Sequence, residues 1–82
     1  MKGDETKQGN EILTQQLEFY KKNNIPIHIM KNDSRFLNGL ILELQFDMLI
    51  LDDFKLGGVP VFFNEIKVLE KYVPKWVLNL EI

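Results

Sequence analysis

The chain contains no cysteine, so neither a disulfide nor a thiolate metal site can stabilise it. Its one histidine, His28, is too few for a zinc cluster unless carboxylates complete the ligand set. A chain of 82 residues buries only roughly 60–65% of the surface that its unfolded form exposes, which leaves a lone core marginal. Self-association or a partner is the remaining source of stability. We therefore expect one small domain that associates and that holds no cofactor and no metal.

Long hydrophobic runs are also missing. No apolar stretch approaches the roughly 20 residues of a membrane-spanning helix. Residues 1–11 lack the apolar core of a secretory signal peptide. These two absences favour a cytoplasmic protein.

The net charge of −2 is mildly acidic and gives no general support for nucleic-acid binding, but the charges are unevenly distributed. Cations dominate between residues 20 and 35, where they are Lys21, Lys22, Lys31 and Arg35. All charged residues between positions 43 and 53 are acids, namely Glu43, Asp47, Asp52 and Asp53. The first block would attract an anionic ligand and the second would repel it.

One helix is predicted near the N-terminus. Residues 1–9 are polar and contain glycine, and we expect them to be disordered. Asn10 can cap a helix that runs to about Asn23. Its apolar residues recur at steps of three and four and form one stripe, made of Ile12, Leu13, Leu17 and Tyr20. Such a stripe requires a sheet to pack on.

Five short strands are predicted after the helix, at residues 25–31, 35–44, 46–53, 59–64 and 65–72. Gly39 lies inside the second strand, where a glycine marks a bulge, a sharp bend or a close backbone approach. The pattern predicts a mainly β fold with one N-terminal helix, namely a strongly bent five-stranded antiparallel barrel over residues 10–73.

The last residues, 74–82, form an amphipathic extension. Its apolar side chains alternate with other residues, at Trp76, Leu78, Leu80 and Ile82. This alternation suits a half-buried sixth strand that packs on its own assembly or on a partner.

Few residues could carry chemistry. His28 titrates near neutral pH unaided, but no second histidine or cysteine accompanies it, so a surface or interface histidine is the more common case. Asp47, Asp52 and Asp53 could hold a hard cation, although acids at a strand end are usually only solvated and no calcium-loop spacing occurs. No nucleophile, base and acid can be assembled into a catalytic set, so we do not expect an enzyme.

Lys21 and Lys22 at the helix end admit two interpretations. They could be ordinary partners of the helix dipole, each worth roughly 0.3–1 kcal/mol. They could also contact phosphate groups, and repetition around a ring would strengthen that binding.

A helix, a turn and five strands of these lengths resemble the Sm/LSm domain, and the residues are similar to its bacterial RNA chaperone branch, Hfq. EILTQQLEFYKKNNIPIHIM, residues 11–30, resembles that family's helix and first strand. RFLNGLILELQFDMLILDD, residues 35–53, resembles its bent second strand, with Gly39 at the glycine position, and its third strand. VFFNEI, residues 61–66, falls where the family carries tyrosine, lysine, histidine, alanine and isoleucine. The resemblance implies a homohexameric ring in which the fourth strand of one subunit pairs with the fifth strand of the next.

The resemblance also implies a pore-type site in which uridine-rich RNA stacks on an aromatic ring. Phe62 stands at the position of that tyrosine, while Phe63 and Asn64 replace the lysine and the histidine. Phe46 and Asp47 stand at the family's glutamine–aromatic pair. Because a carboxylate repeated around a pore would repel phosphate, we expect this site to be altered.

Two further RNA surfaces are implied by the resemblance. Lys21 and Lys22 occupy the rim position, where the family is rich in arginine. Met30, Lys31 and Arg35 stand at the distal-type site, where adenine-rich RNA stacks on an aromatic residue in the family. Methionine lacks the π-face that makes stacking worth roughly 1–3 kcal/mol per base, and the planar group of Arg35 could compensate in part.

Two functional hypotheses follow. In the first, the chain is an Hfq-like ring that binds single-stranded RNA, as an RNA chaperone or a post-transcriptional regulator with an altered pore. In the second, it is an oligomeric Sm-fold protein-interaction module that has lost RNA binding.

Overall fold

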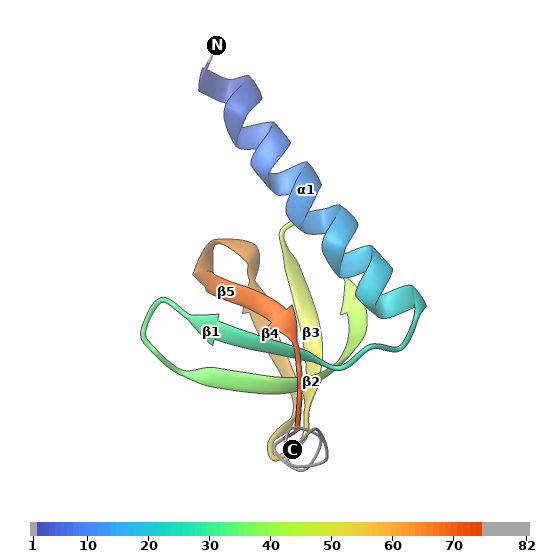
Figure 1. Cartoon of the computed structure of the whole chain (residues 1–82). Helices are drawn as coiled ribbons and strands as arrows, with labels where there is room; N and C mark the ends of the chain where they lie inside the picture. Colours follow the sequence, from blue (N-terminus) through green and yellow to red (C-terminus); the bar gives the residue numbers. More distant parts are fainter. Residues whose placement is uncertain (1, 75–82) are drawn as a thin grey trace, which may run out of the picture.

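The computed structural model describes residues 2–74, and the side chains of residues 11–74. Its elements are helix α1 (Lys2–Lys22), strands β1 (Ile27–Lys31), β2 (Phe36–Leu44), β3 (Met48–Asp53) and β4 (Gly57–Phe62), a 3-10 helix η1 (Phe63–Glu65) and strand β5 (Ile66–Lys71). The strands form an antiparallel sheet in the order β4-β3-β2-β1-β5 (Figure 1). This mainly β fold with one N-terminal helix confirms the predicted fold class and matches an Sm-like fold. The sixth strand considered for the extension falls on residues 75–82, outside the described residues.

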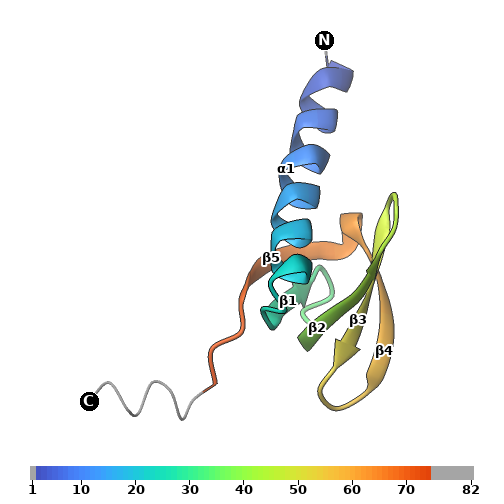
Figure 2. The ribbon, with the colours of Figure 1, turned by 90° about the vertical axis from the view of Figure 1, so that its right-hand side faces the viewer.

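The sheet is bent, as predicted, and it is not closed into a barrel within one chain. β4 and β5 are its two edges, and no strand pairing joins them among the described residues. Part of the bend arises in β2, whose register against β3 shifts between Ile41 and Glu43. Figure 2 shows β3 and β4 folding away from β1 and β5. Two strand edges are therefore left open.

Gly39 is a point of close backbone approach. A Cβ atom at this position would lie 2.0 Å from the carbonyl oxygen of Asp52, which belongs to the neighbouring strand β3. Of the three roles open to this glycine in the sequence, close approach is the one that the structure supports directly. The bulge follows along the same strand.

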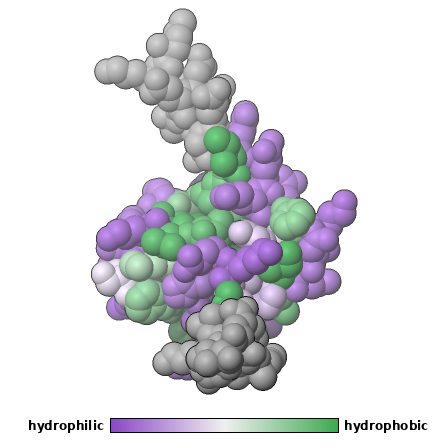
Figure 3. All heavy atoms as spheres, viewed as in Figure 1, coloured by the Kyte–Doolittle hydropathy of each residue, from purple (hydrophilic) through white to green (hydrophobic). Residues whose placement is uncertain are grey.

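The core lies between the C-terminal half of α1 and the concave side of the sheet. Its members are Leu17, Ile27, Ile29, Leu37, Ile41, Leu49, Leu51, Val61 and Phe63. Complete burial of one such side chain contributes roughly 1.5–3 kcal/mol. Leu17, Leu13 and Tyr20 confirm the predicted helix stripe, but Ile12 is exposed and does not belong to it. Figure 3 shows apolar surface beside α1, with hydrophilic residues around it.

Helix α1 begins at Lys2 and not at Asn10, so the predicted cap at Asn10 is wrong. Residues 2–9, expected to be disordered, form its first turns. Gly9 lies inside this helix and costs only about 1 kcal/mol relative to alanine, which is too little to end it. The N-terminal half of α1 projects beyond the sheet (Figures 1 and 2).

The C-terminal end of α1 has a defined stop. Asn24 has a φ of 53°, in the left-handed region that asparagine tolerates. Its N–H donates to the carbonyl of Lys21 at 3.2 Å, and the N–H of Ile25 donates to the carbonyl of Tyr20 at 3.0 Å. These two bonds form a Schellman motif. The motif fixes the last helical turn, which carries Lys21 and Lys22.

Candidate nucleic-acid interface

Most of the predicted pore-type residues lie together, where β3 begins and β4 ends. The backbone N–H of Phe63 donates to the carbonyl oxygen of Asp47 at 2.9 Å. Met48, the first residue of β3, is paired with Phe62, the last residue of β4. Phe46 stands in the turn before β3 and is 97% exposed. Met48 was not among the predicted site residues, although it follows directly after two of them in the sequence.

Phe62 and Phe63 point to different environments. Phe62 is 47% exposed, whereas Phe63 is 8% exposed and belongs to the core. Strand β4 ends at Phe62, and Phe63 begins η1, so the predicted fourth strand over 59–64 is two residues too long at this end. Phe63 therefore stabilises the fold and is not an exposed replacement for a lysine.

Asn64 is exposed in η1, and its carbonyl oxygen is already occupied. The side-chain amide of Asn32 donates to this oxygen at 2.9 Å, and the backbone N–H of Asn32 donates to the carbonyl of Glu65, also at 2.9 Å. Asn32 thereby ties the turn after β1 to η1. Nothing in the local sequence around Asn32 indicates this contact, because it joins segments far apart in the chain.

We call the exposed residues Phe46, Asp47 and Phe62 the aromatic corner. The two rings offer faces on which a base or an apolar group could pack. Asp47 directly follows Phe46 in the chain and is also exposed, and its negative charge disfavours a phosphate nearby. The aromatic corner is thus better suited to apolar contact than to the backbone of a nucleic acid.

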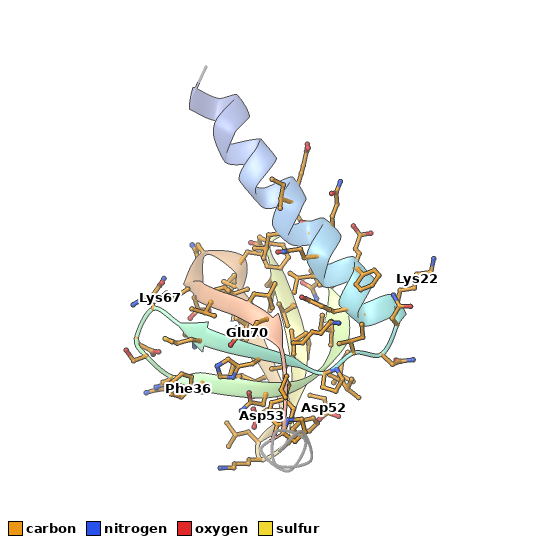
Figure 4. The ribbon with its side chains drawn as sticks, viewed as in Figure 1. Lys22, Phe36, Asp52, Asp53, Lys67 and Glu70 are labelled. Carbon is orange, nitrogen blue, oxygen red and sulfur yellow. The ribbon has the colours of Figure 1, made fainter. Side chains whose placement is uncertain are left out.

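The rim lysines border a hollow of about 720 Å³ between α1 and the end of β2. Its lining residues are Thr14, Glu18, Lys21, Lys22, Leu42, Glu43, Leu44 and Gln45. Both lysines are exposed, and neither forms an ion pair with another described residue. Figure 4 shows Lys22 projecting away from the helix end. Because Glu18 and Glu43 share the hollow, its charge is mixed, with the lysines at the helix end.

The distal-type cations are held by neighbouring acids. Lys31 Nζ lies 3.2 Å from Glu65 Oε2, and Arg35 Nε lies 3.4 Å from Asp33 Oδ2. Met30 is half-buried within β1. The structure therefore places Met30, Lys31 and Arg35 on one hairpin, but with their charges already paired.

The turn of this hairpin contains a serine in a backbone conformation that favours glycine. Ser34 has a φ of 71°, which glycine adopts without strain and serine adopts at a cost. Asp33 Oδ1 accepts a hydrogen bond from the backbone N–H of Arg35 at 3.0 Å and supports the turn. The backbone expected for a glycine is thus present with serine in its place.

The two acidic residues at the end of β3, Asp52 and Asp53, lie in different environments. Asp53 is 8% exposed, and its carboxylate accepts hydrogen bonds from the backbone N–H groups of Asn38, Lys55 and Leu56 at 2.9–3.0 Å. Burial raises the pKa of this carboxyl, but the three donors and the Lys55 charge outweigh it and leave the pKa below its ordinary value. Asp52 is exposed. Within residues 2–74, no cluster of three potential metal ligands occurs.

His28 lies on β1 and is positioned by contacts with two residues of β2. Its ring stacks on Phe36, with centroids 5.3 Å apart. Its Nδ1 lies 2.5 Å from Asn38 Oδ1, within hydrogen-bond distance. The His28 side chain is thus half-buried and held against β2.

No protein-family model and no curated protein matches this chain significantly. None of the helices in the described part of the chain could cross a membrane.

Proposed function

We propose that this chain is an Sm-like protein of the Hfq type that assembles into a cytoplasmic ring and binds single-stranded RNA. The observation that carries the proposal is the pair of exposed lysines, Lys21 and Lys22, which are fixed by the helix stop beside a surface hollow. They lie at the end of the helix that packs against a sheet whose strand order and bend match an Sm-like fold. Repeated in each subunit, the pair would form a basic band for phosphates.

This RNA binding would depend on phosphates more than on bases. The aromatic corner carries an acid, and the cations of the distal-type site are paired with Asp33 and Glu65. The rim is then the main contact, and its lysines act as point charges without the bidentate geometry of arginine. We propose a role as an RNA chaperone or post-transcriptional regulator with weak sequence preference.

The first prediction concerns salt. Short oligoadenylate and oligouridylate should bind at low salt and weaken as salt rises, as measured by fluorescence anisotropy. Replacing both lysines, K21A/K22A, should flatten the plot of log affinity against log salt, because each lost phosphate contact removes roughly 0.7 from its slope.

A charge-matched control is available in the β3–β4 turn. Lys55 is exposed and does not border the rim hollow, so K55A should change the slope much less than K22A does. Equal slopes for K22A and K55A would contradict a rim site. If neither oligomer binds to the wild type even at low salt, the RNA proposal fails.

The second prediction concerns mass. We expect native mass spectrometry and sedimentation to show a closed oligomer, a hexamer under the resemblance, because both sheet edges are open in the subunit. A monomer at every concentration tested would rule out the ring.

The protein-interaction module remains a second candidate, favoured by the aromatic corner. Phe46 and Phe62 expose two rings beside an acid, a combination that suits an apolar partner surface better than RNA. An oligomer that binds neither RNA would support this alternative.

A further inference from the structure

The outer edge of β4 has an unusual set of backbone groups. Phe63 directs its N–H toward β3, where it donates to Asp47. Because this direction alternates along a strand, Gly58, Pro60 and Phe62 direct their backbone groups away from β3, to the open edge. A proline is tolerated at such an outward position, since no bond within the sheet is lost there.

This edge has carbonyl acceptors but few donors. Pro60 has no N–H, and the N–H of Phe62 donates to Glu65 Oε1 at 2.9 Å. Of the three outward residues, only Gly58 keeps an N–H without a partner in the described part of the chain. A strand that pairs here would have to supply N–H groups and compete with Glu65 for Phe62.

Glu65 is fixed in this position from a second side. Its other carboxylate oxygen lies 3.2 Å from Lys31 Nζ, and its side chain is 37% exposed. The Phe62 N–H and Lys31 hold the pKa of Glu65 below its ordinary value, although partial burial and the nearby charge of Asp33 oppose them. The carboxylate therefore remains charged at neutral pH and bridges β1 to the end of β4.

The edge of β5 offers the complementary groups. The N–H of Tyr72 donates to the carbonyl of Pro26 beside β1, so by alternation Leu69 and Lys71 direct their backbone groups outward. Both residues carry an N–H. A second copy of this chain can therefore present donors to the acceptor-rich edge of β4.

We propose that Glu65 caps the β4 edge and thereby limits self-association through it. A second copy can accept a hydrogen bond from the N–H of Phe62 only after the Glu65 carboxylate has released this N–H. This inference rests on the proposed function, in which copies of the chain assemble into a ring. It adds Glu65 as a residue that controls the assembly of that ring.

The test compares E65A with the wild type by sedimentation over a range of protein concentrations. E65A leaves Phe62 N–H without its acceptor, so half-assembly should occur at a roughly tenfold lower concentration, as expected for one hydrogen bond to a charged group. E65Q keeps an acceptor oxygen but loses the charge and should lie between the two. Glu11, an exposed acid on α1, provides the charge-matched control E11A, which should assemble as the wild type does.

A second measurement reports on the cap itself. In dilute monomer, the amide hydrogen of Phe62 should exchange with solvent faster in E65A than in the wild type. If the wild type assembles and E65A assembles equally well or less well, the cap is refuted while the ring stands. If the wild type is monomeric and only E65A assembles, the cap is supported and the native ring is not. If neither assembles, both proposals fail.

Discussion

Replacing Gly39 with alanine, G39A, is expected to lower the free energy of unfolding by about 3 kcal/mol or more, at the upper end of overpacking effects. The new Cβ would lie 2.0 Å from the carbonyl oxygen of Asp52 and 2.7 Å from its carbonyl carbon. These are backbone atoms, so no side-chain rotation relieves the clash. Relief requires β2 and β3 to separate beside Asp53, whose carboxylate joins the same two strands.

Gly58 supplies the matched control. A Cβ there would lie 3.8 Å from Ile50 Cγ2, an ordinary van der Waals contact, and Gly58 does not have a positive φ. G58A should change stability by no more than about 0.5 kcal/mol. Urea unfolding followed by circular dichroism would measure both variants. Similar midpoints for G39A and G58A would show that β2 can move away from β3 at little cost.

The elements of the fold could be predicted from the sequence because their signals are local. The spacing of Leu13, Leu17 and Tyr20 alone predicts which side of the helix is buried. Ile27 and Ile29 likewise alternate with half-buried neighbours. The start of α1 could not be found in this way, because a favourable cap at Asn10 does not prevent helical residues before it from continuing the helix.

The candidate site was less predictable because its properties depend on distant contacts. Alternation places Phe62 and Phe63 on opposite sides, but only the 3-10 turn after β4 decides that Phe63 enters the core. The charges of Lys31 and Glu65 neutralise each other across residues far apart in the sequence. A pattern of residue types reveals that a lysine is present, but not that its charge is already paired.

Asp53 illustrates the same limit, and its replacement carries the second large effect. D53N should lower the free energy of unfolding by about 2–3 kcal/mol, because hydrogen bonds to a charged acceptor contribute roughly 1.5–3 kcal/mol each and the amide keeps only one acceptor oxygen. The carboxylate holds the N–H of Asn38 on β2 through one oxygen and those of Lys55 and Leu56 through the other. The variant would strain both the sheet and the β3–β4 turn.

Asp52 is the matched control, since it precedes Asp53 on the same strand and is exposed (Figure 4). D52N should alter stability by less than about 0.5 kcal/mol in urea unfolding at pH 7. Equal losses for the two variants would contradict the role assigned to Asp53.

The pH dependence gives an independent reading of the same group. The pKa of Asp53 in the folded chain lies below its ordinary value of 3.8, so its contribution is fully present above that value and is lost as the pH falls toward the folded pKa. The pKa of Glu65 is likewise lowered, from an ordinary value of 4.5, so its contribution to stability is also lost as the pH falls. Both the wild type and D53N contain Glu65, so its contribution cancels in the difference between their free energies of unfolding. This difference should shrink only below about pH 4. A difference that stays constant from pH 7 to pH 3 would mean that the hydrogen bonds of Asp53 do not depend on its charge.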